Sequence, residues 1–228
     1  MQSEESLPPP PIEALAHHGP GLMVETILKH PERMVRELRG PRAARAIGVL
    51  FALGVAAYLL YGLLVGSFSG GAQWWAAPLK IAGGMVFSSL ICLPSLYIFA
   101  CLARSDSGLR ECLGLQAGLL ALSGILLIGF LPVAWVFSSS IEALPFMGFL
   151  HLMFWFVAFN FGARFLRAGM KDFGAEVLSP VRVWTFMFFI VCLQMTSTLR
   201  PLLGEADAFF PVAKRFFTTH WFEVIGNG

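Results

Sequence analysis

The sequence predicts an all-α membrane protein, a polytopic bundle of five transmembrane helices with a cytoplasmic N-terminus and an outer C-terminus. Of its 228 residues, 57% are hydrophobic and only 13% are charged, and the mean hydropathy is +0.71. Soluble domains carry about 25% charged residues. Five apolar blocks approach the roughly 20 residues that cross a bilayer. The basic residues, moreover, alternate from one side of these blocks to the other.

The first 20 residues are predicted to form a disordered cytoplasmic tail. They combine a run of four prolines at 8–11 with Ser, Glu and Gly. Such a composition buries too little apolar surface to order a chain. We expect no fixed structure in this segment.

Residues 21–43 are predicted to form a basic amphipathic helix beside the first span, broken or kinked at Pro31. Arg33, Arg36 and Arg39 recur every three residues, next to apolar positions. Helices of this kind lie against anionic head groups, and each positive charge contributes about 1 kcal/mol. We expect these arginines to bind lipid, and a solvated linker helix is the alternative.

The transmembrane domain is expected over residues 44–200, followed by an outer interfacial tail at 201–228. At 1.5 Å per residue, each apolar block can cross hydrocarbon about 30 Å thick. The tail contains an apolar stretch, but proline and charged residues interrupt it too often for a sixth span. The five spans are expected at 44–66, 79–103, 112–137, 146–166 and 183–199.

The distribution of Lys and Arg predicts the orientation. The segments on the side of the N-terminus hold 12 basic residues and the opposite segments hold 4. Basic residues accumulate in cytoplasmic loops, so the N-terminus is expected inside and the C-terminus outside. Because the charge reports orientation, we expect no nucleic-acid partner.

Small residues predict where helices pack. Gly48, Ala52 and Ala56 repeat every four residues in the first span, and Gly114 with Gly118 forms a G-x-x-x-G motif in the third. Small side chains let helix backbones approach closely in lipid. The pattern fits internal packing and dimerisation equally well.

Polar side chains inside the spans predict interhelical hydrogen bonds. His151 is the only histidine within a predicted span. It can be a hydrogen-bonded packing residue, a contact with a partner, or a ligand of a cofactor shared with another subunit. The residues expected at buried or interhelical positions are Ser95, Gln116, His151, Asn160 and Gln194.

A clamp is predicted at the outer end of the fifth span. Arg200 lies there, and an arginine in that position either snorkels to the head groups or meets an acid. We expect it to pair with Glu142 of the third loop. Snorkelling, or pairing with Glu205 or Asp207 of the tail, are the alternatives.

The sequence lacks the motifs of an enzyme. It has no H-E-x-x-H, G-x-S-x-G, D-x-D or Walker-type glycine loop. Its four cysteines form no C-x-x-C pair and lie in or beside apolar runs, where they pack as small apolar groups. We therefore predict no catalytic site, no metal site and no cofactor.

Three short motifs, at residues 37–41 (ELRGP), 92–95 (CLPS) and 194–204 (QMTSTLRPLLG), resemble segments of the Yip family of five-span membrane proteins and of bacterial proteins loosely assigned to it. Residues 37–41 (ELRGP) are similar to the D-L-x-G-P motif of eukaryotic members, with Glu37 in place of Asp. Residues 92–95 (CLPS) and 194–204 (QMTSTLRPLLG) look like segments of the bacterial relatives. The resemblance implies the five-span topology, a bacterial cytoplasmic (inner) membrane and a non-enzymatic role in interaction or membrane organisation.

The leading functional hypothesis is an accessory or scaffold protein that binds other membrane subunits, or a second copy of itself, within the lipid bilayer. A small transporter or channel is the first alternative, because Gln116, Asn160 and Gln194 place polar groups in the spans. A subunit of a cofactor-containing membrane complex, with His151 at the cofactor, is the second.

Overall fold

The computed structural model describes residues 20–69, 73–140 and 144–198, and within these ranges the secondary structure is entirely helical. The predicted tail before Pro20 and the segment 201–228 lie outside the described residues. The helices are α1 (Pro20–Lys29), α2 (Pro31–Glu37), α3 (Ala43–Ser69), α4 (Gln73–Leu102), α5 (Leu109–Gly129), α6 (Leu131–Ser140), α7 (Leu144–Asp172) and α8 (Ser179–Thr198).

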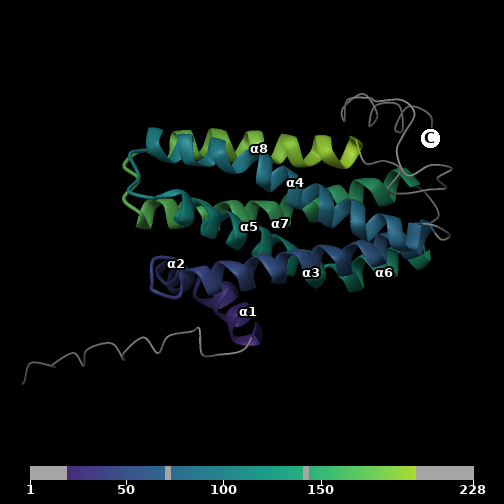
Figure 1. Ribbon diagram of the computed structural model, residues 1–228. Helices are drawn as coiled ribbons and strands as arrows, with labels where there is room; N and C mark the ends of the chain where they lie inside the picture. The colour runs from purple at the N-terminus through teal and green to yellow at the C-terminus, as the bar shows by residue number, and fades with distance from the viewer. Residues whose placement is uncertain (1–19, 70–72, 141–143, 199–228) are drawn as a thin grey trace, which may run out of the picture.

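The long helices run lengthwise beside one another, with α5 at the centre (Figure 1). α5 packs against α3, α4 and α7. In α5, 72% of the most apolar stretch is buried, against 33% to 44% in the other three long apolar helices. α8 packs mainly on α4, at the edge of the bundle.

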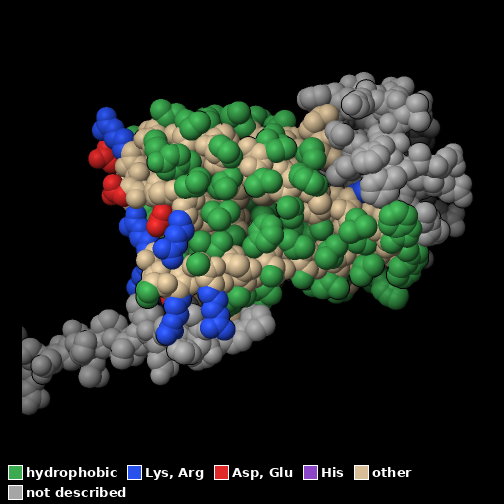
Figure 2. Space-filling model, in the orientation of Figure 1, with side chains coloured by type: hydrophobic (Ala, Val, Ile, Leu, Met, Phe, Trp, Pro, Cys, Tyr) green, Lys and Arg blue, Asp and Glu red, His purple; other side chains and the backbone are tan. Residues whose placement is uncertain are grey.

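Four helices, α3, α4, α5 and α7, are long and apolar enough to cross a membrane, and α8 has a shorter apolar stretch over Ser179–Met195. Figure 2 shows hydrophobic side chains along the flank of the bundle, whereas most of the visible Lys, Arg, Asp and Glu side chains lie at one end. A lipid bilayer makes such an extended apolar flank favourable. The chain is an integral membrane protein.

Several span boundaries differ from the sequence prediction: α7 continues to Asp172 instead of residue 166, and α8 begins at Ser179 instead of residue 183. α4 begins at Gln73 instead of residue 79, so that Trp74 and Trp75 also belong to the helix. The predicted span 112–137 is divided into α5 and α6 at Phe130. The division follows from Pro132, which cannot donate a backbone hydrogen bond and crowds the preceding turn.

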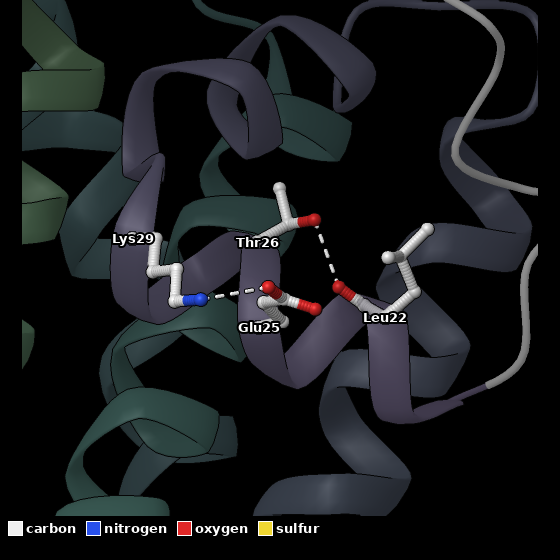
Figure 3. A network of polar contacts seen from close by, with 4 residues as sticks. All are labelled: Leu22, Glu25, Thr26 and Lys29. Carbon is white, nitrogen blue, oxygen red and sulfur yellow. Dashed lines mark hydrogen bonds and ion pairs between the residues drawn. The ribbon is translucent and has the colours of Figure 1, made fainter.

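The N-terminal segment folds as two short helices that meet at His30, because Pro31 occupies the first turn of α2. Figure 3 shows the polar contacts along α1: the Thr26 hydroxyl donates to the Leu22 carbonyl and the Lys29 ammonium donates to Glu25, both at 2.8 Å. Hydrogen bonding and charge from Lys29 hold the pKa of Glu25 below its usual value.

At two glycines the backbones of neighbouring helices approach each other closely, and these contacts set the spacing of the helices. A Cβ added to Gly62 of α3 would lie 2.9 Å from the Pro78 nitrogen of α4, so the two backbones touch. A Cβ at Gly162 of α7 would lie 2.8 Å from the Leu119 carbonyl oxygen of α5. No side chain fits between backbones at these distances, so the helices can reach these positions only with glycine.

The predicted G-x-x-x-G motif lies inside the bundle. Gly114 and Gly118 are buried in α5. A Cβ at Gly114 would meet the Leu38 side chain at 3.0 Å, and one at Gly118 would meet the Phe165 ring. This part of α5 therefore packs against α7 and against Leu38, the residue that follows α2.

The predicted small-residue stripe on α3 does not pack within the bundle. Gly48, Ala52 and Ala56 are exposed, and a Cβ at Gly48 would have no heavy atom within 4 Å. The opposite face of α3 is buried instead, because it carries the large side chains Tyr58 and Tyr61, at 2% and 1% exposed. Burial of these rings removes more apolar surface than burial of alanines.

Candidate functional site

A buried polar pair links α3 to α7. The Tyr61 hydroxyl and His151 Nδ1 are hydrogen-bonded at 2.5 Å, and both side chains are buried. The Tyr61 ring also lies edge-on to Trp155, on which Tyr58 stacks with ring centroids 5.7 Å apart. Of the three readings of His151, this geometry is that of the hydrogen-bonded packing residue.

A second set of hydrogen bonds links α4 to α5 and α8. The Gln116 amide of α5 donates to the Ser89 carbonyl of α4 at 2.9 Å. The Trp184 indole N–H of α8 donates to the Ser95 hydroxyl of α4 at 3.0 Å. Since Trp184 is 1% exposed, it is the anchor of α8 on the bundle.

Several buried polar atoms have no hydrogen-bond partner in the described part of the chain. An unsatisfied buried polar group costs about 1–3 kcal/mol, so each such atom calls for an explanation. In the same ranges no three His, Cys, Asp or Glu side chains are grouped as metal ligands would be. The unpartnered atoms are Tyr58 Oη, Ser88 Oγ, Ser89 Oγ, Gln116 Oε1 and His151 Nε2.

Asn160 is not at a buried or interhelical position. It is exposed on α7, and no hydrogen bond to its amide is formed within the described chain. It lies nine residues after His151 in the same helix, and at about 100° per residue it points to the opposite side. Gln194 is half-buried on α8.

The loops at the charged end are joined to each other. The Asp106 amide donates to the Phe173 carbonyl at 2.9 Å, and the Glu176 amide donates to the Ala103 carbonyl at 3.1 Å. Arg104 and Glu176 add an exposed ion pair at 2.9 Å. The α4–α5 and α7–α8 loops therefore lie at the same end of the bundle.

The N-terminal basic segment meets the same end. The Arg39 guanidinium lies 4.3 Å from the centre of the Phe173 ring, and Arg110 donates to the Gly40 carbonyl at 3.4 Å. The three segments that carry the 12 basic residues are thus neighbours in space, as the alternation of charge requires.

The apolar face of the N-terminal segment packs on the protein, while the binding of its arginines to lipid head groups stays a prediction. Met34, Val35 and Leu38 are 0% to 1% exposed. The notch at Gly114 receives Leu38, so the bundle offers a closer-packed surface than lipid does. Arg33, Arg36 and Arg39 remain exposed.

Sequence reasoning missed Tyr58, Tyr61 and Trp184 as interior anchors, and Lys80 as a buried residue at 3% exposed. Tyr58 and Tyr61 had a readable signal, because two tyrosines three residues apart inside an apolar block share one helix face and need partners for their hydroxyls. Trp184 had none, because its contact with α4 decides its burial.

The predicted clamp between Arg200 and Glu142 lies outside the described residues. Comparison of the chain with known protein families, characterised proteins and solved structures found no match.

Proposed function

We propose that this protein is a non-enzymatic scaffold or accessory subunit that binds a protein partner in the membrane through the exposed face of α3. The observation that carries this proposal is the outward position of Gly48, Ala52 and Ala56. Small side chains give no added contact with lipid, but they let a second helix approach closely and pack along the backbone of α3. The partner is another membrane subunit or a second copy of the chain.

Close packing of the helices at two positions supports this role over transport. α3 meets α4 at Gly62 and α7 meets α5 at Gly162, in both cases with backbones in contact. Interior helices joined in this way form a rigid platform for a partner, whereas a conducting path needs room for its substrate.

We further propose five spans with α8 as the last, an N-terminus in the cytoplasm and a C-terminus outside, in a bacterial inner membrane. Support comes from the charged end in Figure 2 and from the joined loops. A reporter active only outside should be silent after Gly40, Ser107 or Phe173 and active after Gly71 or Ser139. Activity after Ser107 would exclude this topology.

Photo-crosslinking in native membranes tests the proposed partner face. A photoreactive side chain at Ala52 should give a discrete adduct of higher mass. The same side chain at Leu90, which is 64% exposed on α4, should give only lipid adducts. Gly48→Leu should abolish the adduct at Ala52 without unfolding the protein, because Gly48 has open space around it.

Absence of any protein adduct at Ala52, or an adduct that persists in Gly48→Leu, would contradict the proposed function. Mass spectrometry of the adduct identifies a second copy or a different subunit. Both of these results support a scaffold.

The second candidate function is transport of a small polar solute. The unpartnered buried atoms favour it, because an occupant of the interior would satisfy them. Flux into liposomes that is lost in Gln116→Leu would place transport above scaffolding.

A further inference from the structure

Three arginines lie close together where α7 ends and α8 begins. Arg167 lies five residues before the end of α7 and Arg182 three residues after the start of α8. At 1.5 Å per residue these positions are about 8 Å and 5 Å from the loop, so the two side chains are level. Arg164 lies one turn further along α7, which packs on α8 through the Phe159 and Phe189 rings, with centroids 4.9 Å apart.

No acid neutralises this cluster within the described chain. The ion pairs formed among the described residues join Lys29 to Glu25, His30 to Glu32 and Arg104 to Glu176, and none of them includes an arginine of the cluster. Arg164 contacts the Phe161 ring at 5.8 Å. Glu176, the carboxylate of the connecting loop, is already held by Arg104. Like charges at the edge of a membrane repel one another, so a bound anion would stabilise their proximity.

The exposed face of α7 continues from the arginines toward the apolar part of the bundle. Asn160 lies one helical turn beyond Arg164, exposed and without a hydrogen bond in the described chain. Phe156 and Met153 follow on the same face, at 56% and 44% exposed. The order along the helix is therefore cationic, amide and apolar. A phospholipid has the matching order of phosphate, ester carbonyl and acyl chain.

We propose that the α7–α8 junction binds one anionic phospholipid. Arg164, Arg167 and Arg182 hold its phosphate, the Asn160 amide donates to an ester carbonyl, and Phe156 contacts an acyl chain. This site is separate from the α3 face and does not depend on the proposed function. It differs from the N-terminal arginines, whose apolar neighbours are buried in the protein.

The test uses the purified full-length protein, and native mass spectrometry counts the lipid that remains bound. Phosphatidylglycerol should bind with a stoichiometry of one. Phosphatidylcholine should bind more weakly, because its choline opposes the cationic cluster. Arg164→Gln with Arg167→Gln should weaken phosphatidylglycerol binding by about 25-fold, at about fivefold per arginine, and Arg182→Gln by about fivefold.

The matched control is Arg42→Gln with Arg45→Gln. These arginines are also three residues apart and at the charged end, and both are exposed, so the control removes the same charge outside the site. It should leave binding unchanged. Equal losses in both double variants would overturn the site in favour of a diffuse electrostatic effect.

Two further measurements test whether the lipid lies on this face of α7 and whether the site binds a lipid or free phosphate. Asn160→Leu keeps every charge and alters an exposed position, so it should fold and still weaken phosphatidylglycerol binding. Unchanged binding in this variant would overturn the assignment of the lipid to this face. Glycerol 3-phosphate is the soluble probe, and competition at an affinity equal to that of the lipid would mean a site for free phosphate.

Discussion

Gly62→Ala is expected to lower the free energy of unfolding by about 1–3 kcal/mol, the usual cost of overpacking a close-packed core. The new Cβ would lie 2.9 Å from the Pro78 nitrogen. Because that neighbour is backbone within α4, a side-chain rotation cannot relieve the clash. The helices must separate. Unfolding of the purified protein in denaturing detergent, followed by circular dichroism, measures the loss.

Gly48→Ala is the matched control in the same helix. It makes the same chemical change where no heavy atom lies within 4 Å of the new Cβ. Stability should stay the same or rise slightly, because alanine favours a helix more than glycine does. Equal destabilisation by the two substitutions would mean that the loss does not come from contact between α3 and α4.

Leu38→Ala is expected to destabilise the packing of the α1–α2 segment by about 2–5 kcal/mol, the range for truncation of a buried leucine. Leu38 is 0% exposed and fills the notch at Gly114. Loss of its side chain leaves a cavity where the segment meets α5. Limited proteolysis should then cleave residues 20–40 faster than in the unaltered protein.

Leu28→Ala provides the comparison, since Leu28 is 46% exposed on α1 and its truncation creates no cavity. Its cleavage rate should not change. If Leu38→Ala left the cleavage rate unchanged while Leu28→Ala raised it, the segment would be held by its exposed face, as a lipid-bound helix is.

The transmembrane character of this chain follows from the sequence alone. A long apolar helix buries its backbone polar groups internally whichever neighbour it meets, so composition and length suffice to predict it. The same holds at Pro31, where the predicted break between two short helices is a property of the proline ring itself. The alternation of Lys and Arg likewise placed three distant segments at one end, where the loops now meet.

The sequence does not show which face of each helix is buried in the protein and which face meets lipid. Gly48, Ala52 and Ala56 form as regular a pattern as Gly114 and Gly118, yet the first set is exposed and the second is buried. In lipid the two sides of an apolar helix are almost equally apolar, so the period of the sequence does not distinguish the lipid side from the protein side. In water, polar residues would have marked the exposed face.

The sequence by itself determined that the chain enters a membrane as a set of helices with most of its basic residues at one end. These properties depend on the transfer of each segment into lipid, which is nearly a sum over its own residues. Only the tertiary structure decided that Tyr61 meets His151, that Trp184 anchors α8, and that the arginines of α7 and α8 come together. Each of these is a contact between helices distant in sequence, and its energy depends on the distance and orientation that packing imposes.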